Sequence, residues 1–285
     1  MKTKLFLLSL LLFVILPVYS QMIVNSGGSS SKFAKFAELE ILAESKLECI
    51  YAYTVKDLER KSSQTEYMIL QAGNTLSKFW GLSNYRRDSV IYQMDITKIS
   101  TNEAGRIYGK YGSVSLLKDK FFIDGISGKV TVLGRIFLDN YVYEEDIPAI
   151  AWDITNQRDT ICGYACQQAT ATFAGRNWAA WFANIPVNAG PWKLCGLPGL
   201  ILKAEDEEKE HCFEAITIRN STQSIHKEKK HYIKTTRDKY IKGLNKHMED
   251  PGTAYRGTMY APKDENGKEI EVKSYKPFYN QIEKL

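Results

Sequence analysis

The sequence predicts a mainly β (α+β) protein, with a single curved antiparallel sheet or half-open barrel and a few covering helices. Three observations lead to this prediction. Segments rich in β-branched and aromatic residues recur along the chain, turn-forming residues separate them, and one stretch alternates small apolar and polar residues with a period of two. Because no internal repeat and no linker-like stretch interrupts the middle of the chain, we expect one domain over residues 36–285.

The first twenty residues have the pattern of a secretory signal peptide. Lys2 and Lys4 precede an apolar run that Pro17 ends, and compact residues stand before Gln21. The run is shorter than the roughly 20 residues of a membrane span. We therefore expect residues 1–20 to be removed and residues 21–35 to form a flexible lead-in. The mature chain, without a transmembrane segment, would be exported to the periplasm or beyond the cell; an uncleaved N-terminal anchor is the alternative.

Size and charge restrict the range of partners. Removal of residues 1–20 would leave 265 of the 285 residues and would lower the formal charge from +5 to +3. So weak a positive charge does not indicate a nucleic-acid partner. The mature chain would keep five cysteines, enough for two disulfides and one free thiol in an oxidising compartment.

Composition predicts the elements of the N-terminal half. Residues 36–43 have a helix-like pattern, and residues 47–55 have the composition of a strand. Residues 67–71 and 129–138 are β-branched and aromatic between turn-forming pairs, so we expect two further strands there. The segment 79–128 mixes both patterns and receives no prediction.

The strongest strand signal runs over residues 160–218. Ala169, Ala171 and Phe173 alternate with polar residues, residues 174–177 suit a turn, and residues 178–183 return as a strand. A helix over 177–184 is the alternative. It would place Trp178 and Trp181 on one face, whereas a strand places them on opposite faces, and the upstream alternation favours the hairpin. Residues 199–204 and 212–219 should pair across the acidic run 205–210, which we expect to be a solvated loop tip.

A helix is predicted near the C-terminus. Its apolar residues recur at helical spacing, and Asp250, Pro251 and Gly252 supply the stop. The opposite face is basic, which fits either contact with acidic lipid or nucleic acid or a solvated surface; acidic residues elsewhere nearly balance it, so a solvated face is favoured. The apolar set is Ile233, Tyr240, Ile241, Leu244 and Met248, and the basic set is Lys234, Arg237, Lys239, Lys242 and Lys246.

The most specific motif runs from Gly190 to Leu202 and reads Gly-Pro-Trp-Lys-Leu-Cys-Gly-Leu-Pro-Gly-Leu-Ile-Leu. It resembles the signature of the GLPGLI family, an exported family of uncharacterised function. The resemblance implies a secreted or periplasmic β-rich domain of outer-membrane-bearing bacteria, with an outer-membrane receptor or another envelope protein as partner. Further similar blocks are Ser77–Phe79, Asp88–Ser89, Gly163–Cys166, Phe173–Trp178, Ala180–Phe182, Ile185–Pro186 and the tail Tyr279–Glu283, where Gln281 replaces a common proline.

The residue types of this motif predict a rigid loop that enters an apolar strand. Prolines fix their φ angles and lack a backbone donor. Pro198 and Gly199 suit the centre of a type II turn, and the other glycines permit close backbone approach. The motif loop comprises Gly190, Pro191, Gly196, Leu197, Pro198 and Gly199.

Two roles for the loop remain open at this stage. In a structural role, Leu194, Leu197 and Leu200 pack inward and the loop plugs the open end of the sheet. In a binding role, aromatic and cationic side chains line the mouth of a pocket for an anionic or aromatic ligand, since indole faces and a bidentate guanidinium bind such groups. The concave side of a curved sheet would also supply an apolar cleft for a hydrophobic or peptide-like ligand. The candidate ligand-binding residues are Arg176, Trp178, Trp181, Trp192 and Lys193.

The cysteines suggest two further hypotheses. Cys195 and Cys212 flank the strand at Leu200 and its return, and they are the candidate disulfide. Cys162 and Cys166 would lie about 13 Å apart on a strand, beyond bonding distance. Cys166 is the candidate nucleophile of a hydrolase-like envelope enzyme, although no neighbouring base is evident.

No motif indicates a cofactor or a catalytic metal. The four histidines lack zinc-ligand spacing, and the chain has no serine-hydrolase elbow, phosphate loop or dinucleotide fingerprint. The sequence therefore favours an exported, non-catalytic binding or accessory protein of the envelope. An envelope enzyme and a purely structural or assembly protein are the alternatives.

Overall fold

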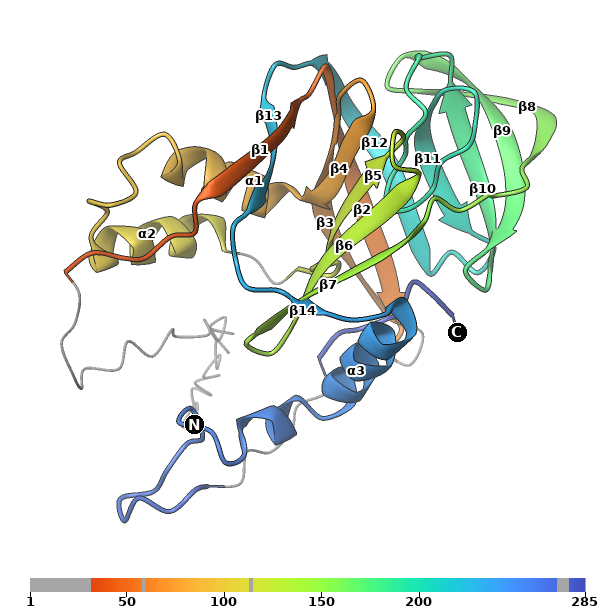
Figure 1. The fold of residues 1–285 in the computed structure, drawn as a ribbon. Helices are drawn as coiled ribbons and strands as arrows, with labels where there is room; N and C mark the ends of the chain where they lie inside the picture. Colours follow the sequence, from red (N-terminus) through yellow and green to blue (C-terminus); the bar gives the residue numbers. More distant parts are fainter. Residues whose placement is uncertain (1–31, 58–59, 113–114, 271–276, 285) are drawn as a thin grey trace, which may run out of the picture. The chain divides into compact units, whose positions relative to one another are not determined.

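The computed structural model describes residues 32–57, 60–112, 115–270 and 277–284. Most of the strand-rich segments join one twelve-stranded sheet, whose order is β14-β7-β6-β5-β4-β3-β2-β12-β11-β10-β9-β8. The sheet curves strongly and its two edge strands, β14 and β8, are not paired with each other (Figure 1). Its strands are β2 (Leu47–Asp57), β3 (Ser62–Ala72), β4 (Leu76–Gly81), β5 (Lys120–Asp124), β6 (Lys129–Ile136), β7 (Asp139–Asp146), β8 (Asp153–Ile161), β9 (Tyr164–Phe173), β10 (Arg176–Ala183), β11 (Leu200–Asp206), β12 (His211–Asn220) and β14 (Ile233–Lys234).

The predicted fold class is confirmed. Neighbouring strands of the sheet are antiparallel, apart from the short parallel pair of β14 with β7. A separate two-stranded ribbon joins β1 (Leu39–Glu44) to β13 (Ser224–Glu228). The helices are α1 (Leu82–Ile91), α2 (Thr101–Tyr111), α3 (Arg237–Glu249) and the 3-10 turn η1 (Pro251–Tyr255).

The hairpin predicted at residues 169–183 is present, with a two-residue turn. Phe173 pairs with Arg176, and the intervening Ala174 and Gly175 have φ angles of 52° and 73°. Two consecutive positive φ angles are the geometry of a type I′ turn, which matches the twist of the flanking strands. Trp178 points into the core and Trp181 lies half-buried on the opposite face, as a strand requires.

Two helix predictions need correction. Residues 36–43 do not form a helix, because Leu39 to Glu44 pair as β1 with β13, a partner about 185 positions later in the chain. The C-terminal helix starts after Ile233, because Ile233 and Lys234 hydrogen-bond to β7. Thr236 then caps α3 by accepting a hydrogen bond from the backbone of Lys239, and the helix ends at Glu249 as predicted.

The two faces of the sheet bury different groups. One face carries the main core, in which Tyr51, Phe213, Trp178 and Trp192 are fully buried. On strands β5 to β7 the opposite face carries a smaller apolar cluster around Phe122 and Leu133, which the β1–β13 ribbon covers in part through Ile225 and Ala43. Each face of this part of the sheet therefore presents its own apolar surface.

The described residues from Phe33 onward form one compact unit. The predicted signal peptide, residues 1–20, and residues 21–31 of the predicted lead-in lie outside the described residues. In the described part of the chain, no helix combines the length and the apolar character that a membrane crossing requires.

Candidate functional site

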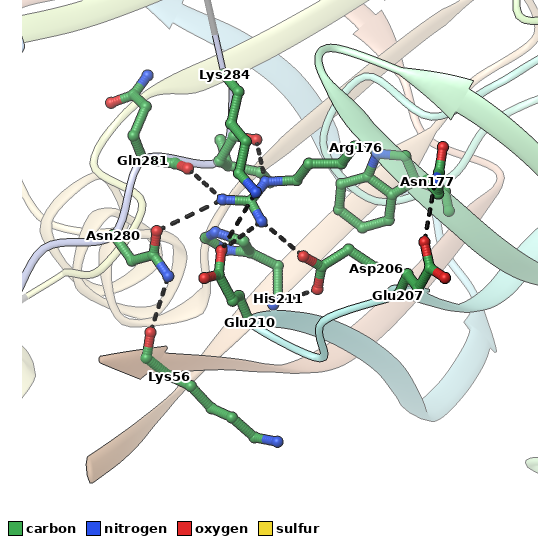
Figure 2. Close-up of polar contacts among 12 residues, drawn as sticks. Lys56, Arg176, Asn177, Asp206, Glu207, Glu210, His211, Asn280, Gln281 and Lys284 are labelled. Atoms are coloured by element: carbon green, nitrogen blue, oxygen red, sulfur yellow. Dashed lines mark hydrogen bonds and ion pairs between the residues drawn. The ribbon is translucent and has the colours of Figure 1, made fainter. Parts of the chain in front are cut away.

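Arg176, the first residue of β10, is buried and fully coordinated. Its side chain is 2% exposed. Nη1 lies 2.6 Å from Asp206 Oδ2 and 2.6 Å from Glu210 Oε2 (Figure 2). Nε donates to the carbonyl of Ile282 at 2.8 Å, and Nη2 donates to the carbonyl of Gln281 at 2.7 Å and to Asn280 Oδ1 at 3.5 Å. A guanidinium has five N–H donors, so each of them has an acceptor within the protein.

The acidic run at residues 205–210 is only in part the solvated tip that we expected. Asp206 and Glu210 are 1% and 8% exposed, whereas Glu207 and Glu208 face solvent. Burial alone would raise the pKa of Glu210, but the hydrogen bond and the charge of Arg176 lower it overall. Asp206 and Glu210 of this turn therefore point inward and pair with the guanidinium of Arg176, which lies 30 and 34 residues earlier in the chain.

His211, directly after this turn, is a site residue that sequence reasoning missed. It is 0% exposed, its backbone N–H donates to Asp206 Oδ1 at 2.8 Å, and its Nδ1 lies 2.8 Å from Tyr53 Oη. Burial, with a further contribution from Arg176, lowers its pKa to about 3. It is therefore a neutral imidazole at physiological pH. No spacing signal pointed to it, because its partner Tyr53 comes from β2, more than 150 residues earlier in the chain, and Asp206 is the last residue of β11.

Lys193, in the motif loop, is also buried and paired. Its exposed fraction is 2%, and Nζ lies 2.5 Å from Glu145 Oε1 and 2.6 Å from Glu283 Oε1. Arg237 of α3 contacts the other oxygen of Glu283 at 2.7 Å. Glu283 belongs to the C-terminal tail (residues 277–284), the same segment that Arg176 contacts.

The five predicted ligand-binding residues do not form one open pocket. Trp178 and Trp192 pack on each other, with ring centroids 5.9 Å apart, and are fully buried. Trp181 lies on the other face of β10, where Lys203 Nζ is 5.1 Å from its ring. The five side chains do not surround one exposed pocket, because Trp178 and Trp181 alternate across the strand and the C-terminal tail covers Arg176 and Lys193.

The motif loop packs its leucines inward, as the structural role requires. Its leucines, Leu194, Leu197 and Leu200, are buried in the main core. The predicted type II turn is replaced by a tighter one, in which Gly199 N donates to Leu197 O at 2.8 Å. A Cβ on Gly199 would lie 2.0 Å from the carbonyl oxygen of Ala183, so only glycine fits this approach.

A small cavity lies under the tail. It measures about 100 Å³ and is lined mainly by aromatic and aliphatic side chains, among them Tyr143, Tyr240 and Trp192, with residues 277–283 as one wall. Trp192 Nε1 is buried and has no hydrogen-bond partner among the described residues. Burial raises the pKa of the lining Asp119 to about 6, and its carboxylate accepts a hydrogen bond from Tyr240 at 2.6 Å.

A much larger opening lies on the opposite face of strands β5 to β7. This cleft measures about 980 Å³ and lies between that face, the β1–β13 ribbon and the segment leading to β14. We call it the lysine-rimmed cleft, because Lys129, Lys227, Lys230 and Lys234 line it together with apolar residues. None of the candidate residues from the sequence belongs to it.

The cysteine hypotheses are not supported. All five cysteines, each of which is described, are free. Cys195 precedes β11, whereas Cys212 pairs with Glu205 at the far end of that strand, so the predicted bridge cannot form. Cys166 is 1% exposed and burial raises the pKa of its thiol, which contradicts a reactive nucleophile.

The described residues also contain no group of three or more histidine, cysteine or acidic side chains that could hold a metal ion.

Comparison with known proteins adds a likeness of fold. No family model and no curated protein matches the chain. A structure of PNGF-II in space group P21 is similar to 71% of this chain, with a TM-score of 0.50 and 13% sequence identity. A second structure, in space group C2, gives 0.49 and 12%. The chain spans about a third of the length of these proteins, 33%, and at such identity the likeness concerns the fold alone.

Proposed function

We propose that this protein is an exported, non-catalytic binding protein of the bacterial envelope, and that its ligand site is the lysine-rimmed cleft. The observation that carries the proposal is an open cleft of about 980 Å³ with an apolar floor. Volumes of roughly 300–1,000 Å³ are typical of small-molecule sites. The signal-peptide pattern and the GLPGLI resemblance support export.

The floor of the cleft is apolar. Phe122 and Leu133 form its centre and are buried, and Leu76 and Val142 extend it as half-buried residues. These side chains project from β4 to β7 on the face that the main core does not use. An apolar chain laid on this floor would remove further hydrophobic surface from water, at about 25 cal/mol for each Å² buried.

The rim favours an acidic group. Four lysines line the cleft, against two carboxylates, Asp124 and Glu144. Three of the lysines have acidic partners outside the lining, such as Asp146 at 2.6 Å from Lys129. The pairs of Lys129 and Lys227 are solvent-exposed, and such pairs contribute little and exchange readily. Glu228, the partner of Lys230, is buried and pairs with Lys120 as well. Lys234 has no ion pair with any described residue. We therefore propose a ligand with an apolar chain and an acidic head group.

Titration calorimetry with dodecanoate, below its micelle concentration, tests the proposal. Thr131 lines the middle of the cleft from β6, so Thr131→Trp should fill it and weaken binding at least 10-fold. Thr160→Trp, at an exposed position of β8, is the matched control and should bind as the wild type does. Equal binding of dodecanoate by both variants would rule out this cleft.

The charge preference needs a second comparison. Lys230→Glu combined with Lys234→Glu should weaken dodecanoate binding several-fold and leave dodecylamine binding unchanged or stronger. Lys239→Glu combined with Lys242→Glu, at two exposed positions of α3, makes the same change in net charge and is the matched control. If dodecylamine binds the wild type as tightly as dodecanoate does, the acidic head group is wrong and only the apolar part of the proposal stands.

The same proposal includes an envelope partner, because the family resemblance implies an outer-membrane receptor or another envelope protein. Export is tested by fractionation and N-terminal sequencing, with a mature chain that begins at Gln21 as the expected result. Crosslinking in intact cells, with the wild type and Thr131→Trp side by side, then shows whether a partner is captured and whether the cleft is needed. Stoichiometric assembly without ligand binding would favour the purely structural alternative.

A further inference from the structure

The C-terminal tail lies in the body of the protein as a bound peptide does. The carbonyl of Gln281 accepts a hydrogen bond from Arg176 (Figure 2). The carbonyl of Ile282 also accepts one from Arg176, and the backbone N–H of Lys284 donates to Ala174 O at 3.0 Å. Contacts to backbone groups position a peptide whatever its side chains are, and pockets for individual side chains then add specificity.

Side-chain contacts of the tail supply that specificity. The carboxylate of Glu283 lies between Lys193, at 2.6 Å, and Arg237, at 2.7 Å. The side chain of Ile282 is buried in the main core. Asn280 Nδ2 donates to Lys56 O at 2.9 Å. The rest of the protein therefore has specific contacts for an amide, an apolar and an acidic side chain of the tail.

The backbone of the β9–β10 turn leaves room for the tail. A Cβ placed on Gly175 would lie 2.7 Å from Lys284 Cβ and 2.8 Å from Lys284 O. Gly175 also has a φ of 73°, which glycine adopts without strain. The turn and the tail therefore fit each other only because this position has no side chain.

The cations that contact the tail would keep ion-pair partners if the tail left the groove. Arg176 retains Asp206 and Glu210, both from the β11–β12 turn. Lys193 retains Glu145 of β7 at 2.5 Å. Departure of the tail would therefore not leave a buried cation unpaired, which is the costly outcome for a buried ion pair. The groove is charge-compensated whether or not it is filled.

The tail also leaves part of the site unused. Trp192 is fully buried, its Nε1 lacks a partner among the described residues, and it lines the cavity of about 100 Å³ that the tail closes. A buried donor without an acceptor costs roughly 1–3 kcal/mol. The site thus has both space and hydrogen-bonding capacity that its present occupant does not satisfy.

We infer that the groove formed by Arg176, Trp192 and Lys193 is a peptide-binding site, filled in this structure by residues 277–284 of the same chain. When its own tail is displaced, it takes the corresponding tail of a second copy. The ligand class is an extended peptide with an apolar residue followed by an acidic one. This site is separate from the lysine-rimmed cleft and does not depend on the function proposed for it.

The first test uses full-length protein with a defective tail. Ile282→Lys combined with Glu283→Lys removes the apolar and acidic anchors and leaves the body unchanged. A fluorescent peptide with the sequence of residues 277–285 should bind this variant, as measured by anisotropy. Wild-type protein should bind it about 100-fold more weakly, because a tethered competitor reaches an effective concentration on the order of 1 mM against a Kd on the order of 10 μM.

A peptide that carries Glu283→Lys is the matched control, and it should bind the variant at least 10-fold more weakly than the native peptide does. Equal binding of the two peptides, or no binding by a variant that circular dichroism shows to be folded, would overturn the inference.

A second measurement covers the case in which the variant does not fold. Wild-type protein is irradiated with millimolar native peptide that carries a photo-crosslinker in place of Tyr279. Crosslinks should map to residues that line the cavity, and unlabelled native peptide should compete while the Glu283→Lys peptide should not. Crosslinks scattered over the surface, or none at millimolar peptide, would show that the tail is a fixed part of the fold.

Discussion

The buried imidazole of His211 should make the protein sensitive to acid in a way that one substitution removes. In the folded state its pKa is about 3, against an ordinary value of 6.5. As pH falls below 6.5, His211 therefore binds a proton in the unfolded chain but not in the folded chain. Stability from this group is fully present above pH 6.5 and is lost as pH falls towards 3.

The magnitude follows from the shift. One pKa unit corresponds to about 1.4 kcal/mol, so the fall from pH 7 to pH 4.5 should cost roughly 2 to 3 kcal/mol of the free energy of unfolding through His211 alone. The cause is burial first, since the ring is 0% exposed, and the neighbouring guanidinium of Arg176 second. Its Nδ1 is engaged by Tyr53, and contacts with the backbone of Gln281 and the side chain of Asn280, which favour the charged form, offset only part of this lowering of the pKa.

Urea unfolding of the wild type and His211→Phe at pH 7 and pH 4.5 measures this contribution of His211 to the free energy of unfolding. The variant keeps a flat ring but loses the hydrogen bond to Tyr53, so it should be less stable at both pH values. Its loss of stability between the two values should nevertheless be smaller than that of the wild type by roughly 2 to 3 kcal/mol. Other titrating groups, such as Asp119 and His226, are common to both proteins and cancel in the difference.

His231→Phe, at an exposed position, is the matched control and should keep the pH dependence of the wild type. The reasoning fails if His211→Phe also keeps it, because the imidazole would then take up its proton equally well in the folded and unfolded states.

Three further predictions concern backbone fit, thiol access and a buried amine. Gly199→Ala should cost more than about 3 kcal/mol, because its Cβ would meet Ala183 O at 2.0 Å, whereas Gly163→Ala has open space and should cost only about 1–2 kcal/mol for its positive φ; equal shifts in thermal unfolding would refute this. Iodoacetamide should label exposed Cys162 at least 100-fold faster than buried Cys166, and mass spectrometry showing equal rates would contradict the burial. Burial lowers the pKa of Lys78, whose Nζ donates to His226 O at 2.8 Å and lies 3.4 Å from the centroid of the Trp80 ring, so Lys78→Met should cost about 1–2 kcal/mol at pH 7 through the lost hydrogen bond; a loss above about 3 kcal/mol would show that the amine is needed as a charged group.

Local patterns predicted the elements whose causes are local. The alternation at Ala169, Ala171 and Phe173 and the glycine at position 175 encode a hairpin, because the side-chain period and the turn geometry are set within a few residues. The same reasoning placed Trp178 and Trp181 on opposite faces. It also predicted the strand over residues 47–55 and the end of the C-terminal helix at Glu249.

Non-local partners decided the rest. Residues 39–44 became a strand only because β13 lies beside them, and the helix-like pattern of that segment carries no information about such a partner. The lysine-rimmed cleft combines residues from β1, β4 to β7, β13 and β14, so no contiguous motif marked it.

The sequence by itself determined a β-rich chain with a rigid, proline- and glycine-containing loop at residues 190–199, because turn chemistry and side-chain period act over short distances. Only the tertiary structure decided what Arg176 and Lys193 do. Their carboxylates and the tail carbonyls come from segments 30 to more than 100 residues away, and burial among them turned two expected ligand-binding cations into anchors for the C-terminal tail.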